Sequence, residues 1–353
     1  MTLKIGFIGF GRVVKWHIKQ LENIDIEVVF VCDKEKTSLK QARNLIPSIK
    51  LFSNIEDLLS DNKIDIDYVI ISTPSGTHFD IAKLISANKN WGLVIEKPTF
   101  LAPKHFAEAR KWKNTIVPIF QNRYNTSVIK AESFLYEDKI GPISHASLSL
   151  DWSRPQRYYD QAEWRGTWLN DGGVSTNQGI HYFDITRHLL GDFISTSAIM
   201  KRIGVDIECE DYLTAHFTME KGFPLDVRMT TALRHPNENA SLSIHGTKGS
   251  IKLYGVCCNK IDLELIDSTE IKSFGNEVEI AYGYGHKVLY QLLTNQEGAS
   301  NLKLATLSES FDTMKFIYSS YESAISGKRS NKTEGYKNMP LGTMQKSRIN
   351  FYE

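Results

Sequence analysis

A short glycine-rich segment between an apolar strand and an amphipathic helix constrains most strongly how this chain can fold. The segment reads Gly6-Phe7-Ile8-Gly9-Phe10-Gly11 and overlaps the apolar run Lys4–Ile8. Glycines at alternate positions permit a tight turn and let backbone N–H groups approach an anion, and the following helix directs its positive end to the same place. The pattern therefore predicts the first unit of a doubly wound parallel sheet of the Rossmann type, with a dinucleotide at its turn.

The alternation of apolar runs and amphipathic stretches continues to about Pro118, as expected for repeated βαβ units. We expect strands at Lys4–Ile8, Glu27–Cys32, Tyr68–Ile71, Leu93–Glu96 and Ile116–Phe120. We expect helices near Arg12–Leu21, Thr37–Leu45, Ile55–Ser60, Thr77–Ala87 and Pro103–Lys113. Residues 1–120 are thus predicted to form an α/β nucleotide-binding domain.

The pattern changes after residue 120, where several strands with alternating apolar and polar residues suggest a large open, mainly antiparallel sheet in an α+β domain. These strands are expected at Ser144–Trp152, Tyr212–Met219, Phe223–Leu233, Ala240–Gly246 and Gly249–Tyr254. Helices are expected near Ser127–Tyr136, Val174–Leu190 and Leu304–Ser326. We expect residues 121–353 to supply the catalytic, substrate-binding and oligomerisation surfaces, with a polar tail at about 328–353 that wraps a surface or a partner subunit.

Charge and hydropathy exclude several classes of protein. The 353 residues carry 42 basic and 41 acidic side chains, so the formal charge of +1 gives no general reason to bind nucleic acid or a membrane surface. The apolar stretches are far shorter than the roughly 20 residues of a membrane span, and the first residues lack the pattern of a signal peptide. We therefore expect a cytoplasmic protein. The four cysteines (Cys32, Cys209, Cys257 and Cys258) have no zinc-type spacing.

An acidic residue at the end of the second predicted strand bears on the choice of cofactor. Asp33 lies 24 residues after Gly9, close to the roughly 20-residue offset of the carboxylate that binds an adenosine ribose. This favours NAD over NADP, although Lys34 could face a 2′-phosphate and Asp33 could simply cap the strand end. Val14 replaces the third small residue of the glycine pattern, which puts close helix–strand packing there in doubt.

Three further motifs resemble the glucose-fructose oxidoreductase / inositol dehydrogenase / MocA (Gfo/Idh/MocA) family. They are Ile71-Ser72-Thr73-Pro74-Ser75-Gly76-Thr77-His78, Glu96-Lys97-Pro98, and the element with Gly172, Gly173, Asn177, Gln178 and His181. The resemblance covers nearly the whole chain and implies an NAD-dependent dehydrogenase in which Lys97 is the principal catalytic residue, accompanied by His181 and Asn177. The expected cofactor-binding residues are Gly9, Phe10, Gly11, Arg12, Val13, Asp33, Thr73, Pro74, His78, Glu96, Lys97 and Gln121.

The chemistry of alcohol oxidation supports this set, because the hydroxyl proton and a hydride must leave together and need a base and a cation nearby. We favour His181 as the base and Lys97 as the orienting cation, although Lys97 could serve as either. Asn177 would lie one helical turn before His181, where many relatives have aspartate. His181, Asp184 and His188 share one predicted helical face, but without a further ligand we expect no metal.

Arginine and aromatic side chains gather before the catalytic element, as suits a sugar joined to an anion. The expected substrate-binding residues are Arg123, Tyr124, Arg154, Arg157, Tyr159, Trp164, Arg165, Asn177, Gln178, His181 and Tyr284. The stretch looks like the family branch that oxidises the 3-hydroxyl of UDP-N-acetylglucosamine or its uronic acid for bacterial surface polysaccharides. Alternatively, the tryptophans pack a core and the arginines form salt bridges.

Three other functions fit the same motifs. They are an inositol or free-sugar dehydrogenase, a glycosidase assisted by bound NAD, and a dinucleotide sensor without catalysis. Lys97 and His181 argue against the sensor, which needs no proton transfer. The small-molecule substrate is the main expected partner, and the family resemblance implies a homo-oligomer, either a dimer or a tetramer.

Overall fold

The computed structural model of the chain describes residues 2–234, 239–268, 271–275, 282–295, 302–332, 336, 339–345 and 349. The chain forms two compact units. The first comprises Met1–Ile119 and His286–Ser310, and the second comprises Phe120–Gly285 and Phe311–Glu353. The sequence analysis placed every residue after 120 in the second domain. It missed the return of His286–Ser310 to the first unit because this segment carries no strand or turn motif of the βαβ type.

The first unit is built on a six-stranded parallel sheet in the order β3-β2-β1-β4-β5-β6. Its strands are β1 (Leu3–Ile8), β2 (Ile26–Cys32), β3 (Lys50–Phe52), β4 (Tyr68–Ile71), β5 (Gly92–Ile95) and β6 (Ile116–Pro118). The order reverses beside β1, so the predicted doubly wound Rossmann sheet is confirmed. The sequence analysis missed β3, which has three residues and no fully buried side chain.

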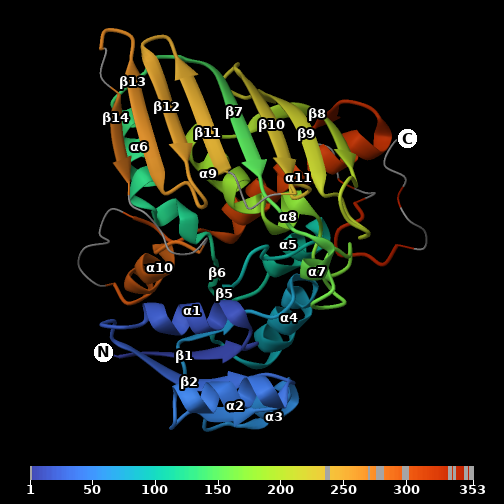
Figure 1. Ribbon diagram of the computed structural model, residues 1–353. Helices are drawn as coiled ribbons and strands as arrows, with labels where there is room; N and C mark the ends of the chain where they lie inside the picture. The colour runs from blue at the N-terminus through green and yellow to red at the C-terminus, as the bar shows by residue number, and fades with distance from the viewer. Residues whose placement is uncertain are drawn as a thin grey trace. The chain divides into compact units, whose positions relative to one another are not determined.

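Five helices of the first unit follow its strands as the amphipathic stretches predict, whereas a short 3-10 turn and the helix after residue 284 were not predicted (Figure 1). They are α1 (Arg12–Gln20), α2 (Lys36–Leu45), α3 (Ile55–Ser60), the short 3-10 helix η1 (Ser75–Thr77), α4 (His78–Asn88), α5 (Pro103–Ala109) and α10 (Gly285–Leu293). Val14 on α1 is fully buried. Close packing of this helix therefore accommodates valine at the position where the glycine pattern has a smaller residue.

The second unit is built on a nine-stranded sheet in the order β14-β13-β12-β11-β7-β10-β9-β8-β15. Its strands are β7 (Ile143–Asp151), β8 (Phe193–Lys201), β9 (Tyr212–Met219), β10 (Pro224–Thr230), β11 (Asn239–Gly246), β12 (Gly249–Tyr254), β13 (Lys260–Leu265), β14 (Lys272–Gly275) and β15 (Ser330–Asn331). Only β7 and β10 pair in parallel among these strands. The predicted open, mainly antiparallel sheet is therefore confirmed.

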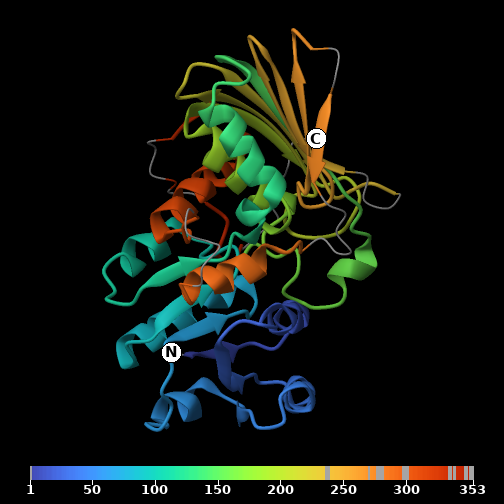
Figure 2. The same cartoon turned by 90° about the vertical axis from the view of Figure 1, so that its left-hand side faces the viewer.

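Three helices lie along one face of this sheet: α6 (Thr126–Tyr136), α9 (Ile180–Leu190) and α11 (Leu307–Ser326) (Figures 1 and 2). The strands show the alternation that one covered face requires, since Ala146, Leu148 and Leu150 of β7 are buried whereas Ser147 and Ser149 are partly exposed. On α11, Phe316 packs against aromatic rings of β8 and β9.

The predicted continuous helix Val174–Leu190 is wrong, because the chain forms α8 (Val174–Asn177) and α9 with Gln178 and Gly179 between them. A Cβ atom at Gly179 would lie 2.4 Å from Met229 Sδ and 2.9 Å from the Ser175 carbonyl oxygen, so close packing at the break requires glycine. Short helices η2 (Gln121–Tyr124) and α7 (Gln156–Tyr159) complete the unit.

Most of the predicted polar tail, residues 328–353, lies outside the described residues. Within its described part, Leu341 is fully buried, and the Gly342 amide donates to the Trp168 carbonyl oxygen at 2.8 Å. This part of the tail therefore packs on the second unit itself. Across the described residues, no helix combines the length and apolar character needed to cross a membrane.

Candidate functional site

The turn between β1 and α1 has the geometry of an anion cradle. Gly9 adopts φ +87°, and a Cβ atom there would lie 2.7 Å from the Ser72 carbonyl oxygen. Around Gly11, a Cβ atom would meet nothing within 4 Å, and no side chain caps the N-terminus of α1. Backbone amides at this helix end are thus directed into open space, an arrangement that suits a pyrophosphate. The residues present fit a dinucleotide.

Gly9→Ala is expected to weaken NAD binding by at least about tenfold, because the left-handed backbone conformation costs alanine about 1–2 kcal/mol and the added methyl group meets Ser72. Gly222→Ala is the matched control, because Gly222 also has positive φ (+90°) but a Cβ atom there meets nothing within 4 Å. Titration calorimetry with NAD should separate the two variants. Equal NAD affinity in both would contradict the assignment of this turn.

Asp33 braces the same turn. Its Oδ2 accepts a hydrogen bond from the Phe10 amide at 2.7 Å, and its Oδ1 accepts one from the Glu35 amide at 2.8 Å. The side chain remains partly exposed at the carboxyl end of β2, and Lys34 beside it is exposed, as is Arg12 on α1. Because each carboxylate oxygen accepts more than one hydrogen bond, the strand-end cap and the ribose role are compatible in one residue.

His78 connects two loops at the carboxyl edge of the first sheet. Its Nε2 lies 2.8 Å from the Thr73 carbonyl oxygen, its Nδ1 lies 3.0 Å from that of Pro98, and its side chain is buried. Burial lowers the pKa of His78, whereas the two carbonyl groups act in the opposite direction. Both ring nitrogens face protein carbonyl groups, so His78 holds the Thr73-Pro74 turn against the segment after Lys97. It is placed to brace the predicted cofactor pocket.

Glu96 and Lys97 follow β5 at the same edge, where parallel sheets bind ligands. Glu96 Oε2 accepts a hydrogen bond from the Lys97 amide at 3.1 Å, and Oε1 accepts one from His17 Nε2 at 2.9 Å. Burial acts to raise the pKa of Glu96, but hydrogen bonds and charges from His17 and His286 lower it well below its usual value. The sequence analysis found Glu96 and Lys97 but missed His17, which belongs to no motif.

In the second unit, the interrupted helix holds Asn177 and His181 on different elements. Asn177 ends α8, its Nδ2 donates to Asp171 Oδ1 at 2.5 Å, and Asp171 is buried. His181 is the second residue of α9 and is partly buried. The expectation of a single regular turn from Asn177 to His181 is therefore wrong. Asp171 thus supplies a carboxylate directly beside Asn177.

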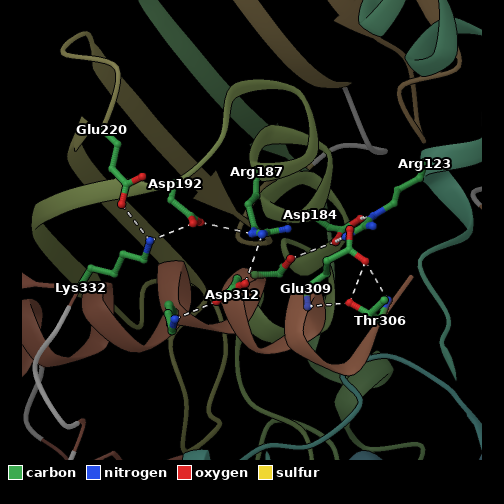
Figure 3. Close-up of polar contacts among 11 residues, drawn as sticks. Arg123, Asp184, Arg187, Asp192, Glu220, Thr306, Glu309, Asp312 and Lys332 are labelled. Atoms are coloured by element: carbon green, nitrogen blue, oxygen red, sulfur yellow. Dashed lines mark hydrogen bonds and ion pairs between the residues drawn. The ribbon is translucent and has the colours of Figure 1, made fainter. Parts of the chain in front are cut away.

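Arg123 does not present its guanidinium group to solvent. Arg123 Nε and Nη2 each donate to Asp184 at 2.6 Å, and both charged side chains are almost fully buried (Figure 3). Thr313 Oγ1 donates to the same carboxylate at 3.0 Å. Asp184, which the sequence analysis considered as a metal ligand together with His181 and His188, therefore pairs with Arg123. His188 Nε2 lies 3.7 Å from Glu132 Oε1. This pairing is the one that a scaffold role for Arg123 requires, and the predicted substrate contact of Arg123 stays a prediction.

Other predicted substrate residues divide between the core and the surface. Tyr124, Tyr159 and Gln178 are buried, Trp164, Arg154 and Arg165 are partly exposed, and Arg157 and Tyr284 are exposed. Gln121, predicted to bind the cofactor, is also buried. The guanidinium of Arg165 stacks on the Tyr158 and Trp164 rings, and that of Arg154 stacks on Trp152 and Tyr158. The tryptophans also divide, since Trp152 and Trp168 are buried in the core.

A surface depression of about 410 Å³ includes two of these residues, Tyr159 and Arg165. Its lining also includes Asp160, Glu163, Asp206 and Glu208 but neither Asn177 nor His181. These four acidic residues disfavour a diphosphate inside the depression itself. The depression is therefore separate from the residues that resemble the catalytic set.

Glu210 is a buried carboxyl group behind α8 that the sequence analysis missed. Its Oε1 accepts hydrogen bonds from the Ser175 amide at 3.0 Å and the Tyr321 hydroxyl at 2.8 Å. A Cβ atom at Gly173 would lie 2.1 Å from the Glu210 carbonyl oxygen, so this glycine lets α8 start against Glu210. Burial raises the pKa of Glu210 to about 7, although its hydrogen bonds act to lower it.

Glu210→Gln is expected to stabilise the protein more at pH 8 than at pH 5. The raised pKa means that the folded chain binds a proton that the unfolded chain releases, so stability falls as pH rises from about 4.5 through about 7. Glutamine has no charge to bury and removes this dependence. Thermal unfolding at both pH values measures the effect, with the exposed Glu264→Gln as control. A parallel change in both variants would be inconsistent with the raised pKa.

Both units match known families by sequence. Residues 3–117 match the oxidoreductase family with an NAD-binding Rossmann fold, and residues 128–252 match the Gfo/Idh/MocA C-terminal domain. The chain belongs to the Gfo/Idh/MocA family. The family resemblance seen in the motifs is thereby confirmed, and the chain is an oxidoreductase whose first unit binds NAD.

Among curated Gfo/Idh/MocA relatives, an uncharacterized oxidoreductase, YdgJ of Escherichia coli, is 24% identical over 339 residues, covering 92% of this chain and 88% of the relative. The scyllo-inositol 2-dehydrogenase (NADP(+)) IolW of Bacillus subtilis is 24% identical over 288 residues, covering 80% and 77%. An inositol 2-dehydrogenase of Rhizobium meliloti is 24% identical over 265 residues, covering 71% and 75%.

Two similar solved structures are WlbA dehydrogenases in complex with NADH and UDP-GlcNAcA. The Chromobacterium violaceum protein has a TM-score of 0.83 and 28% identity, covering 94% of this chain and 96% of the other. The Bordetella pertussis protein has a TM-score of 0.82 and 26% identity, covering 94% and 97%. Together with the inositol dehydrogenases, they show that the chain is an NAD-binding sugar oxidoreductase of this family.

Proposed function

We propose that this Gfo/Idh/MocA member is an NAD-dependent dehydrogenase that oxidises the C3 hydroxyl of a UDP-N-acetylhexosamine or its uronic acid, in the synthesis of bacterial surface polysaccharides. The observation that carries the proposal is the likeness to the Chromobacterium violaceum WlbA dehydrogenase, with 28% identity over 94% of this chain. That protein was solved with UDP-GlcNAcA, whereas the inositol dehydrogenases are 24% identical over smaller shares of the chain.

The segment from Trp152 to Trp168 supports a substrate with rings and negative charge. Arg154 Cζ lies 4.7 Å from the ring centroid of Trp152, and Arg165 Cζ lies 4.4 Å from that of Tyr158, so cation–π contacts restrain both guanidinium groups. Arg157 is exposed on α7 close to both in sequence. Arginine groups restrained in this way suit bidentate contacts with a diphosphate or carboxylate, which a free polyol lacks.

Bound NAD would supply the hydride acceptor, and the residues of the chain would supply acid–base chemistry and orientation. Gly9, Gly11 and Asp33 would hold the cofactor by backbone amides and a carboxylate. His181 would take the proton from the substrate hydroxyl, and Lys97 would orient that oxygen and stabilise its developing negative charge. Asn177, held by Asp171, would fix the same oxygen or its neighbour by hydrogen bonding.

The experiment is incubation with NAD and, separately, UDP-N-acetylglucosamine, its uronic acid and myo-inositol. Absorbance at 340 nm follows NADH, and mass spectrometry of the sugar detects loss of two hydrogen atoms even if NADH stays bound. Conversion of one UDP-sugar is expected. Conversion of myo-inositol alone would overturn the nucleotide-sugar assignment and favour the polyol reaction named for the relatives of Bacillus subtilis and Rhizobium meliloti.

A further inference from the structure

A buried polar cluster in the first unit joins three segments that are distant in sequence. His17 comes from α1, Glu96 from the end of β5, and His286 and Tyr290 from α10. The side chains of His17, His286 and Tyr290 are fully buried, and Glu96 is nearly so. Burying four polar groups is costly unless they are arranged to satisfy one another, so their arrangement calls for a physical reason.

The hydrogen bonds of this cluster form a continuous chain. The Tyr290 hydroxyl lies 2.8 Å from His17 Nδ1, and His17 Nε2 lies 2.9 Å from Glu96 Oε1. Glu96 is ionised and can only accept, so His17 Nε2 carries the proton. Burial raises the pKa of Tyr290 well above its usual value, so the hydroxyl keeps its proton while it hydrogen-bonds with His17 Nδ1.

The chain of hydrogen bonds ends on the backbone of Lys97. Glu96 uses Oε1 for His17 and Oε2 for the Lys97 amide at 3.1 Å. The carboxylate therefore ties α1, which begins at the glycine turn, to the residue that resembles the family's catalytic lysine. Asp33, by contrast, fixes the glycine turn itself through the Phe10 amide.

His286 completes the enclosure of the carboxylate. Its ring is perpendicular to the His17 ring at a centroid distance of 4.4 Å, and its Nε2 lies 3.8 Å from Glu96 Oε1. Burial and the neighbouring His17 lower the pKa of His286 to about 4, so the ring is neutral at physiological pH. A neutral ring there excludes water from Glu96. The titratable rings around the carboxylate are His17, His78 and His286, and Lys97 is the neighbouring cation.

We propose that the Tyr290–His17–Glu96 chain is a positioning device for Lys97, which fixes the lysine backbone relative to α1 so that its amino group meets the reacting substrate oxygen. This inference rests on the proposed catalytic role of Lys97. In this proposal, His17, Glu96 and Tyr290 act through Lys97 and contact neither the cofactor nor the substrate directly.

A metal site is the competing interpretation, because one ligand atom each from His17, Glu96 and His286 lie within 4.8 Å of one another. The separation of 2.9 Å between His17 Nε2 and Glu96 Oε1 is that of a hydrogen bond. It is shorter than the edge of about 3.3 Å expected between ligands of a tetrahedral zinc ion with bonds of about 2.0 Å. The geometry therefore favours hydrogen bonding.

The test compares His17→Leu, His17→Gln and Tyr290→Phe in the full-length protein. Leucine removes the bond to Glu96, whereas the glutamine amide can still donate to it. His17→Leu is expected to lower kcat by about 10²-fold with the Kd for NAD nearly unchanged, since misplacing a catalytic group by about 1 Å has that effect. His17→Gln is expected to recover most of kcat, and Tyr290→Phe, the mildest change, to show a smaller loss. Recovery by glutamine would not follow from a merely space-filling role.

Asn114→Ala is the matched control, because Asn114 Nδ2 donates to the Lys89 and Trp91 carbonyl oxygens just before β5, at the opposite end of the strand from Lys97. This variant is expected to lower the melting temperature without changing kcat. A loss of kcat in Asn114→Ala equal to that in His17→Leu would overturn the proposal, because general destabilisation would then explain both.

Hydrogen exchange keeps the inference separate from the proposed function. The amide of Lys97 is expected to exchange at least tenfold faster in His17→Leu than in the unchanged protein or Asn114→Ala, whether or not any sugar is oxidised. Faster exchange with no turnover of any sugar would support the positioning contact and count against the proposed function alone. Unchanged exchange would overturn the device, as would one equivalent of tightly bound metal per chain in elemental analysis.

Discussion

Lys97→Met is expected to lower kcat for the sugar by about 10²–10⁴-fold, the range that a general acid–base or charge-stabilising group contributes. Methionine keeps the length and apolar stem of lysine but has neither a proton to exchange nor a charge. The backbone bond from Lys97 to Glu96 is unaffected, so the fold of the β5 end and the affinity for NAD should change little. Steady-state kinetics with product detection by mass spectrometry, together with NAD titration, provides the measurement.

Two further variants sharpen that result. Lys104→Met removes an exposed lysine at the start of α5 and should leave kcat unchanged. Lys97→Arg retains a cation that does not lose its proton in proteins. Partial activity in Lys97→Arg would assign Lys97 the role of cation and leave proton removal to His181. A Lys97→Met variant with more than a tenth of normal kcat would remove Lys97 from the catalytic set.

The fold could be predicted from sequence because its signals are local. Glycines at alternate positions, strand-length apolar runs and their alternation with amphipathic stretches lie within a few residues of one another. Elements with weaker local signals were missed. Strand β3 has three residues, and β8, Phe193–Lys201, contains consecutive buried Ser195 and Thr196 that interrupt the period of two. The break between α8 and α9 depends on the packing of Gly179 against Met229, which sequence periodicity does not contain.

The candidate site was predictable only where one motif holds its residues together. Lys97 and Asp33 lie at strand ends, where the topology of a doubly wound sheet places binding groups. The partners of Glu96 lie elsewhere, with His17 79 residues before it and Tyr290 273 residues after His17. Charge pairing is equally invisible in sequence, since Asp184, the partner of Arg123, is 61 residues away. A solvent-facing arginine and a buried one look alike until their partners are known.

Asp184→Ala is expected to destabilise the second unit by about 3–5 kcal/mol, because it leaves the buried guanidinium of Arg123 without its carboxylate. Asp184 also accepts a hydrogen bond from Thr313 Oγ1, so its removal breaks contacts of α9 with both η2 and α11. Urea unfolding of the full-length chain measures the loss. Lys248→Met, which removes one member of an exposed ion pair at 2.7 Å, should cost less than about 1 kcal/mol.

The double variant Arg123→Met/Asp184→Leu decides between a scaffold and a substrate role for Arg123. If the pair is a scaffold, replacing both charges with apolar side chains should restore much of the stability that Asp184→Ala loses, because no uncompensated charge remains. KM for the sugar should then stay within about threefold of normal, because in a scaffold role the guanidinium group donates its hydrogen bonds to Asp184 and does not contact the substrate. A restored stability combined with a KM raised by tenfold or more would instead return Arg123 to the substrate-binding residues.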